Sequence, residues 1–155
     1  MNQDFIEQGD LINRQIKELV GIYRDAVKKL NVSDSEFWIW YTLVTYDGEN
    51  TQQDICSMWS FPKQTVNTTI TKLRLKKLAY LEAVPGTRNR KVIRLTDEGR
   101  AYGEGLISPF TQAEKKAFSK ISLQELSLIS NIFSKYIDIV KESFDEISDR
   151  KQKSF

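Results

Sequence analysis

Two short helical segments joined by a turn at residues 60–62 constrain the fold of this chain more than any other feature. The first begins at Thr51, where TQQD places a hydroxyl side chain three residues before Asp54, and the second spans residues 62–77, PKQTVNTTITKLRLKK. A hydroxyl at the N-cap accepts a hydrogen bond from an amide of the first turn. Proline is tolerated in the first turn of the second helix, because an N–H there would have no intrahelical partner. Two short helices joined in this way predict a helix-turn-helix.

The second segment combines an apolar stripe with a polar face. Val66, Ile70 and Leu73 recur at helical spacing and are predicted to pack on the domain. The other face is rich in threonine and amide side chains, which are weak helix formers but offer hydroxyl, methyl and amide groups to base edges in the major groove. Its lysines and arginine are expected to contact phosphates and so position the module. The candidates for DNA contact in this segment are Lys63, Gln64, Thr65, Asn67, Thr68, Thr71, Lys72, Arg74 and Lys76, with Lys77 beside them.

A basic β-hairpin is predicted directly after the helix-turn-helix. The runs YLEAV (80–84) and KVIRL (91–95) are typical of short strands, and PGTRNR between them contains a Pro-Gly turn signal. A helix-turn-helix followed by such a hairpin is a winged helix. Arg88 and Arg90 lie at the tip of the wing, and arginine is favoured in a narrow minor groove by the enhanced negative potential there. We expect at least one of the two to contact DNA, and of the two we favour Arg90.

The positive charge of the chain is concentrated in this region. The chain carries a net charge of +2, but residues 63–94 hold nine basic residues against one acid, Glu82, which gives that window +8 and leaves −6 for the rest. A basic segment in an otherwise acidic chain is typical of a nucleic-acid-binding surface. Because a solvated basic surface would give the same count, the charge supports DNA binding only together with the helix-turn-helix and the wing. The nine residues are Lys63, Lys72, Arg74, Lys76, Lys77, Arg88, Arg90, Lys91 and Arg94.

Two helices are predicted before the helix-turn-helix. In residues 10–30, apolar side chains recur every three or four positions, which indicates an amphipathic helix. The sequence SDSE at Ser33 predicts a capping box for a helix over 36–46. That helix, EFWIWYTLVTY, is apolar on nearly all sides, as expected for a helix packed between other elements. The pair Asp47-Gly48 is predicted to end it with a turn.

Two further helices are predicted after the wing. The sequence TDEG at 96–99 begins the first, in which Pro109 is expected to produce a kink or a break. The sequence SLQE at Ser122 is a capping box for a long second helix, and the polar tail DRKQKSF (149–155) is expected to fray. The apolar stripe of the long helix consists of Leu123, Leu126, Ile129, Phe133, Ile137, Val140, Phe144 and Ile147.

The outer helices need a partner for their apolar stripes. A winged helix over residues 33–100 is too small to cover both, so we expect them to meet those of a second copy in a twofold homodimer. The predicted fold class is mainly α with a small β-hairpin wing. Its parts are an N-terminal dimerisation helix (1–32), a winged helix-turn-helix DNA-binding domain (33–100) and C-terminal dimerisation helices (101–155).

The composition argues against an enzyme. The 155 residues are 40% hydrophobic and 28% charged, as in a globular protein, and they include one cysteine and no histidine. Histidine is the commonest general base and the commonest metal ligand, and the seven glycines are scattered rather than gathered in a phosphate-binding loop. We therefore expect no catalytic site, no metal site and no cofactor.

Neither a membrane span nor a secretory leader is predicted. A span needs roughly 18–20 predominantly apolar residues in a row, and the first ten residues, MNQDFIEQGD, are polar and acidic rather than leader-like. A single cysteine cannot form an intramolecular disulfide, which suits a reducing compartment. We expect a cytoplasmic protein with no membrane partner.

The cysteine and the aromatic residues near it are interpreted as parts of the core. Cys56 lies on the apolar side of a short helix, where a lone cysteine is usually a small buried residue of low reactivity. Large aromatic side chains dominate core burial. We therefore favour the core over a ligand site as the role of Trp38, Trp40, Tyr41 and Tyr46.

The complete layout resembles the MarR family of bacterial transcriptional regulators. The resemblance rests on the helix-turn-helix from Thr51 to Leu78, the wing that ends in RLTDEG (94–99), and the terminal helices. It implies a homodimer that places one reading helix per subunit in the major groove of a palindromic duplex site, with the wings in the flanking minor groove or along the backbone. The two reading helices would lie roughly 34 Å apart, one turn of DNA. Many such proteins are repressors that a small ligand or cysteine oxidation releases.

Some positions depart from the pattern of the family. Its wing usually carries an aspartate and, two residues later, an arginine, whereas those positions hold Thr87 and Asn89 here. Pro62 stands in place of the usual serine before the reading helix. These departures leave open which of the two wing arginines enters the groove.

The resemblance also implies where an effector would bind. In this family effector pockets commonly lie between the dimerisation helices and the DNA-binding lobe. Tyr23, Trp38 and Tyr41 are therefore the candidates to line an apolar cleft for a small aromatic effector.

An alternative function remains open at this stage. A winged helix can serve as a protein-interaction module without sequence-specific DNA binding, with its basic surface meeting an acidic partner. The positively charged hairpin tip and the polar face of the second helix favour double-stranded DNA as the partner.

Overall fold

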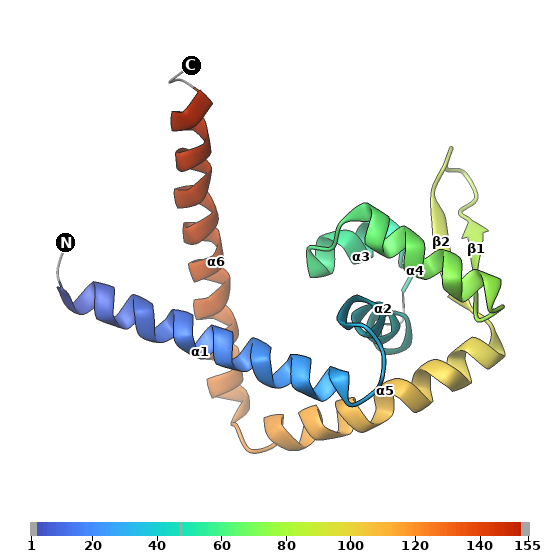
Figure 1. The fold of residues 1–155 in the computed structure, drawn as a ribbon, viewed down its shortest axis with the longest axis horizontal. Coiled ribbons are helices and arrows are strands. Elements are labelled where there is room, and N and C mark those ends of the chain that lie inside the picture. Colours follow the sequence, from blue (N-terminus) through green and yellow to red (C-terminus); the bar gives the residue numbers. More distant parts are fainter. Residues whose placement is uncertain (1–2, 47, 153–155) are drawn as a thin grey trace. The chain divides into compact units, whose positions relative to one another are not determined.

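The computed structural model describes residues 3–46 and 48–152, and its helices and one hairpin confirm the predicted fold class (Figure 1). Contacts divide the chain into two units, Met1–Phe110 and Thr111–Phe155, with the boundary inside helix α5. The elements are α1 (Gln3–Lys28), α2 (Asp34–Thr45), α3 (Gln52–Trp59), α4 (Lys63–Leu75), β1 (Ala79–Ala83), β2 (Lys91–Leu95), α5 (Asp97–Phe118) and α6 (Leu123–Gln152).

Helix α2 forms the centre of the first unit. It begins after Ser33, whose hydroxyl accepts a hydrogen bond from the amide of Glu36 at 3.2 Å, which is one of the two hydrogen bonds of the predicted capping box. Phe37, Ile39 and Trp40 are fully buried, because α1, α3, α4 and β2 all pack against this helix. A helix that is apolar on all sides is therefore enclosed on all sides. Of the predicted turn at residues 47–48, Asp47 lies outside the described residues.

Two glycines bring α5 close to the rest of the first unit. A Cβ added at Gly99 would lie 1.8 Å from the carbonyl oxygen of Leu78, and one added at Gly103 would lie 2.8 Å from side-chain atoms of Trp40 and Val44. The hydroxyl of Thr96 accepts a hydrogen bond from the amide of Gly99 at 3.0 Å. The backbone at the start of helix α5 consequently contacts the connection between α4 and β1. Any side chain at position 99 would prevent this close approach.

Helix α1 has different limits from those predicted. It begins at Gln3 rather than Asp10 and ends at Lys28 rather than Leu30. No residue in the first turns breaks a helix, since Gly9 is in open space and Asp4 lies in the first turn, where an acid complements the helix dipole. The chain leaves the helix through a turn that ends with Asn31 at φ 58°, a left-handed conformation that asparagine tolerates better than most residues.

Helix α5 is continuous through Pro109, so the break that was one of the two predicted outcomes does not occur. Proline removes the hydrogen bond to the carbonyl four residues earlier and crowds that carbonyl. That carbonyl belongs to Gly105. Ile107 and Phe110, on either side of the proline, are buried, and this packing holds the helix together.

Helix α6 begins as predicted and continues further than predicted. The capping box at its start is confirmed, because the amide of Glu125 donates to the hydroxyl of Ser122 at 3.2 Å while the Glu125 carboxylate accepts from the Ser122 amide at 2.9 Å. The tail expected to fray is helical to Gln152, and residues 153–155 lie outside the described part of the chain. No helix within the described residues is long and apolar enough to cross a membrane.

Candidate nucleic-acid interface

The helix-turn-helix consists of α3 and α4 and begins with a reciprocal cap. The amide of Asp54 donates to the hydroxyl of Thr51 at 3.2 Å, and the carboxylate of Asp54 accepts from the amide of Thr51 at 2.8 Å. The hydrogen bonds that this carboxylate accepts from the amide and from the hydroxyl of Thr51 lower the pKa of Asp54. The turn closes through Ser60, which adopts the left-handed conformation at φ 54°. The predicted helix-turn-helix is therefore present, with the cap at Thr51 at its start and the turn at Ser60 between its two helices.

Helix α4 packs on the unit through the predicted stripe. Val66, Ile70 and Leu73 are 0%, 1% and 2% exposed. Thr69 is buried as well, so this threonine belongs to the core rather than to a reading face. Pro62 lies at the N-cap, one position before the helix, and contributes no side-chain hydrogen bond there.

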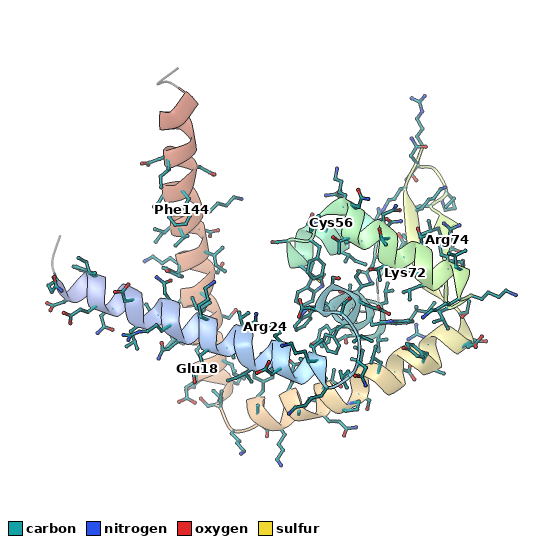
Figure 2. The ribbon with its side chains drawn as sticks, in the orientation of Figure 1. Glu18, Arg24, Cys56, Lys72, Arg74 and Phe144 are labelled. Carbon is teal, nitrogen blue, oxygen red and sulfur yellow. The ribbon has the colours of Figure 1, made fainter. Side chains whose placement is uncertain are left out.

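The opposite face of α4 carries the residues predicted to contact DNA. Gln64, Thr68 and Thr71 follow one another at helical spacing along the middle of this face. Leu75, which the sequence reasoning left out, continues the same line and is 79% exposed. Its spacing from Gln64 was the available signal. The exposed residues of the set are Lys63, Gln64, Asn67, Thr68, Thr71, Lys72, Arg74, Lys76 and Lys77, whereas Thr65 is half-buried; Figure 2 labels Lys72 and Arg74 on this helix.

The wing is an antiparallel hairpin whose base is anchored in the core. Ala79 pairs with Leu95 and Ala83 with Lys91, so β1 begins one residue before the predicted run. Val92 and Ile93 are buried. The turn is closed by the amide of Val84, which donates to the carbonyl of Arg90 at 3.0 Å. The hairpin stands beside the C-terminal end of α4, and its turn projects away from the helices (Figure 1).

The two wing arginines have different surroundings. Both Arg88 and Arg90 are exposed. The positive charge of Arg90 helps to lower the pKa of Asp54, after the larger effect of the hydrogen bonds from Thr51. Arg90 therefore lies within electrostatic reach of the first helix of the helix-turn-helix, a relation that the sequence did not reveal.

Most of the basic residues in the window form no ion pair within the described part of the chain. Among the described residues, only Arg94 of the nine has carboxylate oxygens within 4 Å, those of Glu82 at 2.7 Å and Glu49 at 3.8 Å. The other eight cations surround the reading face and the wing without an intramolecular ion pair. The arrangement supplies positive charge together with a polar helix face, which is what contact with a charged backbone and base edges requires.

A second candidate site is a groove of about 540 Å³ beside α1, α2 and α3. Tyr23 and Trp38, two of the three predicted effector contacts, line it, whereas Tyr41 instead packs edge-on against Trp38 with ring centroids 5.3 Å apart. Sequence reasoning missed the remaining lining residues, because they come from three separate elements. These residues are Leu19, Val20, Arg24, Asp34 and Trp59.

The groove is connected to the helix-turn-helix through Trp59. Its ring lies over that of Trp38 with centroids 4.4 Å apart. Its indole N–H donates to the buried hydroxyl of Thr42 at 2.7 Å, and that hydroxyl donates to the carbonyl of Trp38 at 2.9 Å. Trp38 and Trp59, which both line the groove, are therefore in ring contact and are also linked through the hydroxyl of Thr42.

The remaining predictions about the core have mixed outcomes. Cys56 is buried, as expected for a structural residue, and Trp40 is fully buried. Trp38 and Tyr41 are partly buried against the core. Tyr46 is 45% exposed rather than buried, because it is the C-cap of α2 and lies where the helix reaches the surface. The described residues contain no group of three or more acidic or cysteine side chains placed to hold a metal ion.

Comparison with known proteins gives structural matches only. No protein-family model and no curated protein matches the sequence. A MarR family regulator from Neisseria meningitidis, NMB1585, is similar over 94% of this chain and 99% of its own, with a TM-score of 0.80 and 23% identity. S. aureus MepR, in a complex with DNA, covers 84% of this chain and 94% of its own with a TM-score of 0.61 and 22% identity. Bordetella bronchiseptica BpsR, whose DNA binding is regulated by 6-hydroxynicotinic acid, covers 84% and 98% with a TM-score of 0.58 and 22% identity.

The match to NMB1585 covers 94% of this chain, which is more than a winged helix over residues 33–100 would occupy. The chain therefore has the fold of MarR family transcriptional regulators.

Proposed function

We propose that this protein is a MarR-like transcriptional regulator that binds a palindromic duplex site as a homodimer and acts in the cytoplasm as a repressor. Helix α4 would read base edges in the major groove, and the wing would contact the flanking minor groove or backbone. The observation that carries the proposal is the exposed polar face of α4, surrounded by eight basic residues without ion pairs among the described residues. The fold shared with a regulator solved in complex with DNA supports it.

Selection of bound sequences from a random duplex pool tests this function. Two reading helices related by a twofold axis are expected to enrich an inverted repeat with half-site centres roughly 10 base pairs apart. The alternative, a winged helix that binds an acidic protein partner, predicts retention of duplexes without enrichment of any sequence. A selected pool with the same base composition at every position as the starting pool would contradict sequence-specific regulation.

We also propose that α6 is the principal dimerisation element. None of its described side chains, residues 123–147, is buried within the chain, although Phe133, Ile137 and Phe144 lie on one apolar stripe (Phe144 is labelled in Figure 2). Burying a Phe or Ile side chain is worth about 1.5–3 kcal/mol. A second copy presents the same stripe, so one isologous contact would cover both.

Charge placed on this stripe is expected to produce monomers. In the double variant Phe133→Asp/Ile137→Asp, association would bury two carboxylates per subunit without partners, a cost that neutralises the apolar gain. Sedimentation equilibrium of this variant is expected to show a monomer. In a DNA-binding titration the same variant is expected to have lost most of its affinity. Ser134→Asp adds the same type of charge to the exposed polar side of α6 and is expected to remain dimeric. A dimeric double variant with unchanged affinity would show that α6 is not the interface.

The groove beside α1, α2 and α3 is proposed to bind a small aromatic acid that releases the DNA. It presents aromatic faces from Tyr23, Trp38 and Trp59 and one cation, Arg24. An apolar pocket with a few charged groups is typical of small-molecule sites. The ligand of BpsR, an aromatic acid that regulates its DNA binding, supports this chemical class.

Titration with 6-hydroxynicotinate and benzoate is expected to change tryptophan fluorescence, because two of the three tryptophans line the groove. The melting temperature is expected to rise with ligand concentration, since the ligand binds only the folded state. Arg24→Ala is expected to weaken binding, whereas Arg14→Ala, an exposed arginine of the same helix, serves as the control. Unchanged fluorescence and an unchanged melting temperature over the whole titration would contradict the binding of an aromatic acid in this groove.

A further inference from the structure

Beyond its buried base at Val92 and Ile93, the wing has little within its own sheet to fix its orientation. It is a sheet of only two strands, and an isolated two-stranded hairpin is marginally stable in water. For the wing and α4 to engage one duplex together, the hairpin must be held at a set distance and angle from the helix. The contacts that hold it are therefore part of the binding apparatus, even where they do not touch DNA.

Two contacts connect the wing to the loop that precedes α3. The amide of Ile93 in β2 donates to the carbonyl of Asn50 at 2.9 Å. Next to it on the same strand, the guanidinium of Arg94 lies 3.8 Å from the carboxylate of Glu49. The side chain of Asn50 in turn donates to the carbonyl of Tyr46 at the end of α2, at 3.3 Å. Since residue 51 is the N-cap of α3, these contacts join the wing to the start of the helix-turn-helix.

Arg94 also joins the two strands of the wing. Its Nε donates to the carboxylate of Glu82 on β1 at 2.7 Å. The residue directly opposite Arg94 is Tyr80, so Glu82 is its diagonal neighbour on the same face of the hairpin, within reach of a long side chain. One guanidinium thus contacts β1 and the loop before α3 from its place on β2. A planar group with several N–H donors is suited to such a bridge, whereas a lysine amine is a single point charge.

The charges around Arg94 set it apart from the other basic residues. Two carboxylates offset its charge, and its side chain is 37% exposed, whereas the eight remaining cations of the window have no such partner among the described residues. A phosphate contact by Arg94 would have to displace Glu82 and would place a phosphate beside two acids. The residue is therefore unsuited to a contact with the DNA backbone, although it belongs to the basic window.

We propose that Arg94 is a positioning residue, which through Glu82 and Glu49 holds the wing in register with the reading helix without itself contacting DNA. This inference rests on the proposed DNA-binding function. It reverses the direction in which one substitution is expected to change the DNA affinity. Removing an acid from a DNA-binding protein ordinarily strengthens binding by reducing repulsion of the phosphates, whereas removing Glu82 is expected to weaken it, because the wing loses its tether.

The test compares Arg94→Gln, Glu82→Gln and the double variant by fluorescence anisotropy with a selected duplex. Exposed ion pairs are worth little individually, so each single variant is expected to lose affinity by roughly two- to fivefold per wing. The double variant is expected to lose no more than either single variant, as for two residues that act through one contact. Glu98→Gln, at an exposed acid in the first turn of α5, is the matched control and is expected to bind as tightly as the wild type or more tightly.

A second measurement uses the free protein and does not depend on DNA. The amide of Ile93 is expected to exchange its hydrogen faster in Arg94→Gln and Glu82→Gln, while the amide of Trp40 within α2 keeps its wild-type rate. Tighter or unchanged DNA binding by Glu82→Gln would overturn the proposal, and so would an unchanged exchange rate at Ile93. If the wild type binds no duplex, the proposed function is wrong, and the exchange rates alone decide whether Arg94 holds the wing.

Discussion

The affinity of the dimer for its duplex site is expected to fall by a factor on the order of a thousand or more when the salt concentration is raised from about 50 to about 200 mM. Each cation that neutralises a phosphate releases a condensed counterion, which makes binding steeply dependent on salt. Eight basic residues per subunit form no ion pair among the described residues. Contact by about half of them in each of two subunits gives roughly 8 phosphates, within the range that produces a loss of this size.

Two variants separate backbone contacts from base contacts in the same titration. Lys76→Ala is expected to weaken binding to all duplexes alike and to reduce the slope of log affinity against log salt by about one per subunit. Asn67→Ala is expected to leave the slope nearly unchanged and to relax the preference among selected sequences, because an amide pairs with an adenine edge. An affinity that stays flat across the salt range would contradict a phosphate-binding surface and favour the protein-interaction alternative.

Gly99→Ala is expected to destabilise the folded state by about 3 kcal/mol or more, at or above the upper end of the usual cost of overpacking. A Cβ at this position would lie 1.8 Å from the carbonyl oxygen of Leu78 and 2.7 Å from its carbonyl carbon. These are backbone atoms, which cannot turn aside as a side chain can. The start of α5 would have to move away from the connection between α4 and β1, where the hydroxyl of Thr96 also donates to the carbonyl of Lys77 at 2.9 Å.

Gly105→Ala in the same helix provides the matched control. A Cβ there has nothing within 4 Å, and alanine is the better helix former by about 1 kcal/mol, so this variant is expected to be slightly more stable than the wild type. For Gly99→Ala the melting temperature is expected to fall by about 6–12 °C, as a loss of this size implies for a chain of this length. Thermal unfolding followed by circular dichroism measures both. Equal melting temperatures for the two alanine variants would show that the close approach at Gly99 does not contribute to the stability of the folded state.

The helices and the hairpin could be predicted because their signals are local. A capping side chain and its partner lie three residues apart, as in Thr51 with Asp54 and Ser122 with Glu125, and both pairs form the expected hydrogen bonds. The helical spacing of Val66, Ile70 and Leu73 likewise identified the buried face of α4. A signal that depended on its surroundings was less informative. Of the kink or break predicted at Pro109, the break does not occur, because the buried Ile107 and Phe110 on either side hold the helix together.

The candidate site was predicted less completely than the fold. The DNA-contact set on α4 is exposed as expected except for the half-buried Thr65, since exposure follows from helical periodicity. The groove was predicted only in part, because Arg24, Asp34 and Trp59 come together from separate elements. No pattern along the chain predicts that these three residues line the same groove. Leu75 is not among the predicted contacts, although its spacing places it with Gln64 and Thr68.

The sequence by itself determined the order and type of the elements and the segregation of basic charge, because these depend on residue identity and on spacings of three or four positions. Tertiary structure decided what those residues do. It pairs Arg94 with carboxylates on β1 and on the loop before α3, so a residue counted among the basic ones becomes part of the framework of the wing. It also leaves no room for a side chain at position 99, because the carbonyl of Leu78 occupies that space. Both outcomes depend on distances between segments that are separate in the sequence, and those distances are fixed only when the helices and the hairpin pack together.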